Sequence, residues 1–364
     1  MKHVLFFGIF DPAYPRSSIL KDGFEAHGYD VAECRVDPRA VPGLRKYWRL
    51  WRAGRWMRQE KFDYIVVLFP GHTAVWLARL LFGNRIVFDA FVSLHDSNVY
   101  DRARYTKHSF GAFKDRLLDR VSCLCARVVL VDTEEHRRYF KDYIGVPLHK
   151  CLVVPVGATS LCFHLGEESR ETSETEHTKV GFYGSYIPLH GIPYIVKAAE
   201  LLVREPILFT IIGGGQEWRR VQEMAAALPV APHLEFVPAR PYREVLERMR
   251  VMDICLGIFG DTEKTQRVIS NKVYECAALG KPIITADTPA MHEAFIAGDS
   301  IMLCSHASPE SLAEAIRALA LDAALRKKLG HNARRLMEKR FTPERIVGGL
   351  LDKLTQPEFA SIVA

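Results

Sequence analysis

The sequence lacks several signals that would place it in other classes of protein. No apolar run approaches the ~20 residues of a membrane-spanning helix. The cysteines form no CxxC pair, and most lie in apolar surroundings, which favours reduced core thiols over a zinc site. The first residues, MKHVLFFGIFDP, read as a strand and not as a signal peptide. We therefore expect a cytoplasmic protein without a metal site.

The chain also lacks the glycine motif of dinucleotide enzymes. The turn after the first expected strand reads GIFDPAYPRSS and contains no GxGxxG, which disfavours an NAD-dependent dehydrogenase. Arg16 lies in this turn at the start of an expected helix, where it could meet a phosphate or an acceptor.

Two domains with cores of their own are the expectation for a chain of this length. It has 364 residues, of which 48% are hydrophobic, and this excludes a disordered protein. Residues 165–178 are short of apolar side chains and rich in Glu, Ser and Thr, which predicts a linker. The predicted domains are therefore residues 1–164 and 179–340.

Strand-like runs alternate with helix-like segments in both halves, which predicts an α/β fold with two doubly wound, Rossmann-like parallel sheets. The expected strands of the first half are 3–8, 30–36, 64–69, 85–88, 127–131 and 151–156. Those of the second half are 179–183, 207–212, 234–237, 253–257, 282–285 and 300–304. Ligands of such sheets bind beyond the carboxyl ends of the strands.

The stretch 267–287 reads as a polar loop, a short helix and a buried strand. Asn271 is the expected helix cap. Arg267, Lys272 and Glu275 then lie near the helix start, where two cations and the helix dipole would attract a phosphate and the carboxylate could accept hydrogen bonds from sugar hydroxyls. This pattern suggests a nucleotide-sugar pocket. The alternative is a capped surface helix with solvated charges.

Three turns at the ends of second-half strands could contribute to such a pocket. The turn 184–191 reads GSYIPLHG, and its free amides, with His190, could hold a diphosphate. The run 213–215 is GGG, a weak signal by itself. Pro238 follows the next strand, where backbone groups could contact a nucleotide base.

The segment 42–61, PGLRKYWRLWRAGRWMRQEK, has a basic and aromatic composition that few soluble helices share. The residues that we expect to contact a membrane are Arg45, Lys46, Trp48, Arg49, Trp51, Arg52, Arg55 and Trp56. Such side chains suit an anionic membrane surface, at about 1 kcal/mol for each Lys or Arg near the headgroups. Two alternatives stay open, namely aromatics that pack on the sheet with cations in water, and a nucleic-acid patch.

His95 and Asp96 lie in an expected loop after the fourth strand. His95 could hydrogen-bond a sugar hydroxyl or a developing charge, with Asp96 to orient it, although a lone loop histidine is often only solvated. Further on, 132–134 (DTE) could be a carboxylate metal motif, but we interpret it as the cap and first turn of a helix over 135–143.

Taken together, these segments resemble the family 4 glycosyltransferases, which are retaining enzymes of the GT-B fold. The resemblance rests on segments that follow in the family's order over nearly the whole chain: VVPVGA, FYGSYIPLHGIPYIVKAAELL, IIGGGQE, LEFVPARPYREV, MDICLGIF, NKVYECAALGKPIIT and MHEAF.

The resemblance implies a metal-independent hexosyl transfer with no cofactor. The UDP- or GDP-type donor would be bound mainly by the second domain, and an acceptor would be held by the first, across a cleft. A last helix, 341–355, would pack back on the first domain. By position, Glu275 matches the glutamate that binds the ribose hydroxyls and Lys272 a lysine near the donor phosphates. His95 matches the histidine that faces the transferred sugar.

The resemblance implies a donor site built from the following positions: Gly184, Ser185, His190, Gly191, Gly214, Pro238, Arg267, Asn271, Lys272 and Glu275. The sequence departs from the family pattern at three of them. Arg267 replaces a first glutamate, and Ser185 and His190 replace an arginine and a lysine; Arg267 could supply phosphate charge in their place.

The sequence therefore predicts a retaining glycosyltransferase on the inner face of the cell membrane. Its acceptor would be lipid-linked or a glycan, in the synthesis of cell-surface polysaccharide or glycolipid. The alternatives are a non-catalytic partner subunit of the same fold and a nucleotide-sugar epimerase.

Overall fold

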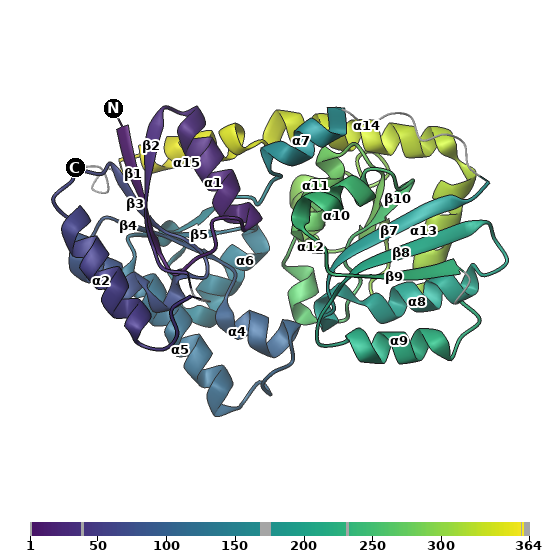
Figure 1. Ribbon diagram of the computed structural model, residues 1–364, viewed down its shortest axis with the longest axis horizontal. Helices are drawn as coiled ribbons and strands as arrows, with labels where there is room; N and C mark the ends of the chain where they lie inside the picture. The colour runs from purple at the N-terminus through teal and green to yellow at the C-terminus, as the bar shows by residue number, and fades with distance from the viewer. Residues whose placement is uncertain (1, 38–39, 168–175, 231–232, 358, 360–364) are drawn as a thin grey trace. The chain divides into compact units, whose positions relative to one another are not determined.

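The computed structural model describes residues 2–37, 40–167, 176–230, 233–357 and 359, and it divides into two compact units (Figure 1). Unit 1 comprises Met1–Val99, Arg104–Val156 and Thr342–Ala364. Unit 2 comprises Tyr100–Ala103 and Gly157–Phe341. Each unit contains a parallel sheet covered by helices, as the sequence predicts.

The sheet of unit 1 has six strands in the order β2-β1-β3-β4-β5-β6, all parallel. The strands are β1 (Lys2–Gly8), β2 (Tyr29–Arg35), β3 (Tyr64–Val67), β4 (Ile86–Phe91), β5 (Val128–Val131) and β6 (Cys151–Val153). Successive residues point to opposite faces, so that Val4 and Phe6 belong to one apolar cluster and Leu5 and Phe7 to the other.

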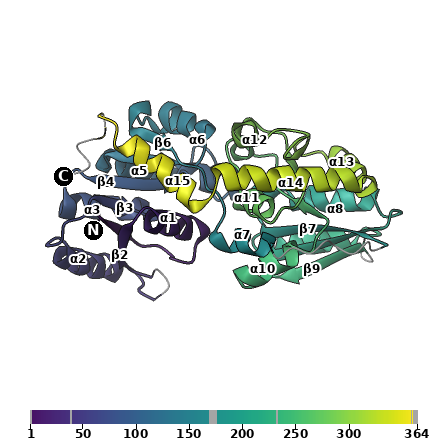
Figure 2. The same ribbon diagram turned by 90° about the horizontal axis from the view of Figure 1, so that it is seen from above.

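The helices of unit 1 cover both faces of this sheet. On one face, α1 (Pro15–Ala26) packs beside α15 (Pro343–Leu354), as Figure 2 shows. On the other face lie α2 (Arg45–Met57), α3 (Val75–Phe82) and α5 (Phe110–Cys125), which share a second core cluster. The shorter helices are α4 (Leu94–Asp96) and α6 (Glu134–Tyr139).

The sheet of unit 2 also has six parallel strands, in the order β12-β11-β10-β7-β8-β9. They are β7 (Thr178–Ser185), β8 (Ile207–Gly214), β9 (Leu234–Pro238), β10 (Ile254–Leu256), β11 (Ile283–Ala286) and β12 (Met302–Cys304). Pairing of Ser185 with Gly214, and of Gly213 with Pro238, aligns the carboxyl ends of β7, β8 and β9 at one edge. The predicted turns therefore lie together.

Unit 2 contains eight α-helices within the described residues. They are α7 (Ser160–Glu167), α8 (Ile192–Leu201), α9 (Trp218–Ala226), α10 (Tyr242–Met249), α11 (Asn271–Ala278), α12 (Pro289–Ala294), α13 (Pro309–Leu321) and α14 (Ala323–Arg340). Residues 165–167, which were expected in the linker, form the end of α7, and Thr178 begins β7. The centre of the expected linker, 168–175, lies outside the described residues.

Among the helices that the structure describes, none combines the length and the apolar character needed to cross a membrane.

Candidate functional site

The helix α11 presents Lys272 and Glu275 from its first turns. Its N-cap is Ser270, which has extended backbone angles, and not Asn271, which is already the first helical residue. The Ser270 hydroxyl makes no cap hydrogen bond, and its oxygen is buried without a partner among the described residues. The helix start therefore offers unused donors to a ligand.

Lys272 is the buried cation of this site. Its side chain is only 4% exposed, and Nζ lies 4.7 Å above the ring of Phe182. Burial lowers its pKa to about 7, against a weaker opposing effect of Cys276 and Asp101. A phosphate placed beside Nζ would restore the charged form, because an opposite charge favours it.

Gly184 leaves the space beside Lys272 open. Its φ is +150°, and a Cβ added there would meet the His190 ring at 2.9 Å and Lys272 Nζ at 3.2 Å. Gly213, on the neighbouring strand, allows a similarly close approach, because its Cβ would lie 2.0 Å from the carbonyl oxygen of Gly184. Gly214 faces open space. Gly213 thus lets β8 come close to β7, and Gly184 keeps the space beside Lys272 free for a ligand.

His190 is hydrogen-bonded to the turn that it closes, and its contact with a diphosphate stays a prediction. The ring is buried, and its Nδ1 donates to the carbonyl oxygen of Ser185, so that Nε2 carries the lone pair. Burial, together with Lys272, holds its pKa well below the usual range. A neutral ring of this kind fixes the turn and supplies no charge to a phosphate. Gly191 is structural too, since its φ is +66° and a Cβ would meet Gly260 N at 2.6 Å.

Glu275 lies one turn after Lys272 and is held by two tyrosines. Tyr242 donates to Oε1 at 2.8 Å, and Tyr183 donates to Oε2. The side chain is 2% exposed, and burial raises its pKa to about 8. Burial thus disfavours the charged carboxylate, and the tyrosines fix the orientation of the group. No local pattern in the sequence pointed to either tyrosine.

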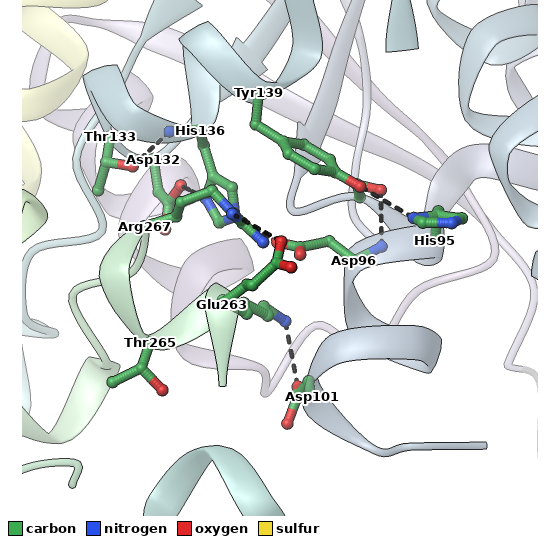
Figure 3. A network of polar contacts seen from close by, with 12 residues as sticks. His95, Asp96, Asp101, Asp132, Thr133, His136, Tyr139, Glu263, Thr265 and Arg267 are labelled. Atoms are coloured by element: carbon green, nitrogen blue, oxygen red, sulfur yellow. Dashed lines mark hydrogen bonds and ion pairs between the residues drawn. The ribbon is translucent and has the colours of Figure 1, made fainter. Parts of the chain in front are cut away.

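Arg267 lies beside the segment Tyr100–Ala103 of the same unit. Its guanidinium carbon is 5.6 Å from the centre of the Tyr100 ring. Its NH1 is 3.9 Å from Glu263 (Figure 3). Next to it, Lys264 Nζ donates to Asp101 Oδ2 at 3.1 Å in a buried ion pair. Asp101 and Lys264 were not predicted, because 163 residues separate them in the chain.

His95 of unit 1 is buried and not in a solvated loop. It lies in α4 at the carboxyl end of β4, with Nδ1 2.9 Å from the Tyr139 hydroxyl and Nε2 3.3 Å from that of Tyr143 (Figure 3). Burial lowers its pKa. The buried Asp119 holds α4 in place by accepting hydrogen bonds from the amides of Leu94 and His95.

Asp96 contacts His136 in the interior of unit 1, and its expected role in orienting His95 stays a prediction. His136 Nε2 lies 3.1 Å from Asp96 Oδ2, and Nδ1 hydrogen-bonds Asp132. Burial lowers the pKa of His136, but the two carboxylates outweigh burial and raise it to about 9. The expected cap is confirmed at Thr133, whose hydroxyl accepts from the His136 amide at 3.0 Å.

Arg16 is a buried residue of unit 1. It is 1% exposed, pairs with Asp89 through NH2 at 2.9 Å, and donates from NH1 to the carbonyl oxygens of Val154 and Pro155. All three guanidinium nitrogens are thus engaged inside unit 1. These contacts hold Arg16 in place within unit 1, and its expected contact with a phosphate or an acceptor stays a prediction.

Two sequence profiles match this chain. Residues 4–157 match the glycosyl transferase 4-like domain, and residues 167–336 match the glycosyl transferases group 1. The chain belongs to the group 1 glycosyltransferases. The profiles cover both units, and this agrees with the resemblance that the motif order carries.

Curated relatives of this glycosyltransferase are similar over part of their length. The D-inositol 3-phosphate glycosyltransferase of Corynebacterium jeikeium is 32% identical over 57% of this chain and 52% of the relative. The D-inositol 3-phosphate glycosyltransferase of Corynebacterium glutamicum is 28% identical over 76% of this chain and 68% of the relative. The chain thus spans about half the length of the first relative.

A solved structure shares the fold of this glycosyltransferase. HepE from Anabaena, crystallised with UDP, superposes with a TM-score of 0.70 at 14% identity, covering 98% of this chain and all of that one. The GT-B fold is therefore confirmed.

The basic aromatic helix of this glycosyltransferase is partly buried. Tyr47 and Trp51 pack against the core of unit 1, whereas Trp48 is 56% and Trp56 71% exposed. The helix also lines a cavity of about 820 Å³ with Glu33, Cys34 and Arg35. Trp51 thus packs within unit 1 and Trp48 and Trp56 face outward, while the membrane contact of these residues stays a prediction.

Proposed function

We propose that this protein is a retaining glycosyltransferase that moves a hexosyl group from a UDP- or GDP-type nucleotide sugar to a lipid-linked or glycan acceptor. The observation that carries the proposal is the placement of Lys272 and Glu275 one turn apart at the start of α11, beside the open turn at Gly184. HepE was crystallised with UDP and with UDP-glucose, which supports a uridine donor.

In the proposed reaction, the bond between the anomeric carbon of the sugar and the donor phosphate oxygen breaks. The acceptor hydroxyl oxygen bonds that carbon on the same face, and its proton passes to the departing phosphate oxygen. Lys272 stabilises the charge that develops on the leaving group, together with the free amides at the start of α11. The reaction requires no metal in this scheme.

Glu275 would accept hydrogen bonds from the ribose hydroxyls through its remaining lone pairs, held in place by Tyr183 and Tyr242. His95 is the group of unit 1 that we place nearest the transferred sugar. Because burial lowers its pKa, it is neutral and acts as a hydrogen-bonding group. Retention of stereochemistry follows from the family resemblance.

The names of the curated relatives and the composition of helix α2 bear on the class of the acceptor. The curated relatives are named for D-inositol 3-phosphate, a polar hydroxyl acceptor. The basic and aromatic helix α2 favours an acceptor at a membrane, and we place the enzyme at the inner face of the cell membrane in polysaccharide or glycolipid synthesis. Flotation with anionic vesicles tests this location. Replacement of Arg49, Arg52 and Arg55 by glutamate should abolish flotation. Unchanged flotation of that variant would contradict the membrane location.

Donor turnover tests the proposed reaction. A panel of nucleotide sugars is first screened for thermal stabilisation of the purified protein. Release of the nucleotide and transfer to an acceptor extract are then measured for the wild type, Lys272→Ala and Glu275→Ala. We expect at least a ~100-fold loss of turnover in Lys272→Ala, as for removal of one transition-state donor. In Glu275→Ala we expect weaker donor binding, and turnover lost with it. Lys197→Ala, an exposed lysine of the same unit, is the matched control.

Two other outcomes would contradict the proposal and favour a different function. Binding of nucleotide sugar without any turnover would favour the non-catalytic partner subunit, to which the arginine at position 267 also points. Release of a changed nucleotide sugar in the absence of any acceptor would favour an epimerase.

A further inference from the structure

Helix α5 points its polar side chains toward the protein and its apolar side chains toward solvent. Asp115, Asp119 and Ser122 are buried, and each is hydrogen-bonded. On the opposite side five large apolar side chains are exposed by between 43% and 82%, namely Phe110, Phe113, Leu117, Val121 and Leu124. A surface helix of a globular protein normally shows the reverse arrangement.

The exposed side chains of α5 form one continuous stripe. They follow one another at spacings of three, four, four and three residues, which places them within about 80° of arc at 3.6 residues per turn. Single exposed apolar residues are common on protein surfaces, whereas a contiguous row of five marks an interaction site. The polar contacts of the buried side fix the helix in this orientation.

The neighbouring helices extend the exposed apolar surface. Helix α3 adds Trp76 and Leu80, and α2 adds Trp48 and Trp56. The three helices are neighbours on the same face of the unit 1 sheet, since the rings of Tyr47 and Trp76 are 6.3 Å apart and Ser122 donates to the carbonyl oxygen of His72, just before α3.

The charge of this surface has one sign. The exposed charged side chains of the three helices are Arg45, Arg49, Arg52, Arg55, Arg79, Lys114, Arg116 and Arg120. The carboxylates of α2, α3 and α5 are Asp115 and Asp119, and both are buried. The surface is thus apolar and basic with no exposed acid on these helices, a combination that complements an anionic lipid headgroup layer.

We propose that α5, with α2 and α3, forms a docking face for an anionic phospholipid bilayer. The stripe of α5 enters the boundary between headgroups and acyl chains, and the flanking cations contact lipid phosphates. A second copy of this chain is a poorer occupant, because a symmetric contact would set arginines and lysines against each other. The inference rests on the membrane contact proposed above and assigns its apolar part to α5.

The double variant Leu117→Glu with Val121→Glu tests the role of α5. Both positions are exposed, so the fold should be kept, which circular dichroism and thermal unfolding verify. In flotation with vesicles of phosphatidylcholine mixed with phosphatidylglycerol, we expect at least ~10-fold weaker binding than for the wild type. Leu321→Glu, an 83% exposed leucine of unit 2, should bind like the wild type.

Two results would overturn the proposal. One is unchanged flotation of the α5 variant. The other is a wild-type dimer that forms without lipid and that the α5 variant dissociates, which would assign the stripe to a second copy.

The tests of α5, of α2 and of catalysis can fail separately. If the triple glutamate variant of α2 loses flotation and the α5 variant does not, the contact through α2 stands and the present inference falls. Because Leu117 and Val121 lie outside the donor site, the α5 variant should release nucleotide from the donor at the wild-type rate. Loss of membrane binding with normal turnover would therefore support the docking role alone.

Discussion

At the residue scale, the buried lysine of the donor site can act as a charge that a substrate switches on. Lys272 has its pKa lowered to about 7 by burial, so it is only partly charged in the unbound protein at neutral pH. A phosphate beside it would raise that pKa, and binding would take up a proton. Affinity and pH should therefore be coupled.

We predict that nucleotide-sugar affinity falls above pH 7, by up to ~10-fold per pH unit, because binding then requires protonation of Lys272. In Lys272→Arg the slope should vanish, since arginine stays charged throughout this range. Titration calorimetry at several pH values, in buffers of different ionisation enthalpy, measures both affinity and proton uptake. An equal slope in Lys272→Arg would assign the titration to another group, with Glu275 the first alternative.

The buried ion pair between Arg16 and Asp89 gives a second prediction at this scale. Arg16→Met leaves the carboxylate of Asp89 buried and unpaired, and we expect a loss of about 3–5 kcal/mol in the free energy of unfolding. Arg35→Met removes a pair with Glu33 that is partly exposed, and should cost about 0–1 kcal/mol. Urea unfolding measures both. Normal stability of Arg16→Met with impaired acceptor binding would instead support the ligand hypothesis for Arg16.

At the scale of elements, the contact between α1 and α15 depends on a glycine. A Cβ on Gly23 would lie 2.3 Å from a methyl carbon of Val347 and 2.4 Å from the carbonyl oxygen of Pro343. The second of these atoms belongs to the backbone and cannot turn away. The return of the C-terminal helix to unit 1 therefore requires a residue without a side chain here.

We predict that Gly23→Ala destabilises the protein by about 1–3 kcal/mol, the usual cost of overpacking. Gly349→Ala is the matched control, because Gly349 is also a helix residue and its added Cβ would meet nothing within 4 Å. That substitution should stabilise by about 0.5–1 kcal/mol, since glycine is a poor helix former. Equal effects of the two changes in chemical denaturation would refute the packing argument.

At the scale of the whole molecule, the two units have apolar clusters of their own. Two clusters of buried side chains lie in unit 1, and two others lie in unit 2. Multidomain proteins of this kind commonly depart from two-state unfolding. The proposed donor site lies in unit 2, so a nucleotide sugar should stabilise that unit selectively.

We predict two transitions in scanning calorimetry. A nucleotide sugar at a hundredfold excess over its dissociation constant should stabilise one of them by about 2.7 kcal/mol. Gly23→Ala should lower only the other, because Gly23 lies in unit 1. A single transition that both the ligand and the variant shift in full would show that the units unfold together.

Much of the architecture was predictable because its causes are local. Apolar runs of strand length, separated by segments of helical spacing, place all the expected strands of both sheets, although their ends shift by up to three residues. Helix α11 was also predictable, since Gly280 and Pro282 end it at its C-terminus. The cap was misplaced by one residue, because capping depends on backbone angles that Ser270 and not Asn271 adopts.

The sequence by itself determined the two parallel sheets, the order of the family motifs and the one-turn spacing of Lys272 and Glu275. Only the tertiary structure decided what those side chains touch. Arg16 and Asp89 are 73 residues apart in the chain, and Tyr183 and Glu275 are 92 apart, so no local pattern could pair them. Burial forces buried polar groups to find partners, and which partners they find depends on the packing of distant elements.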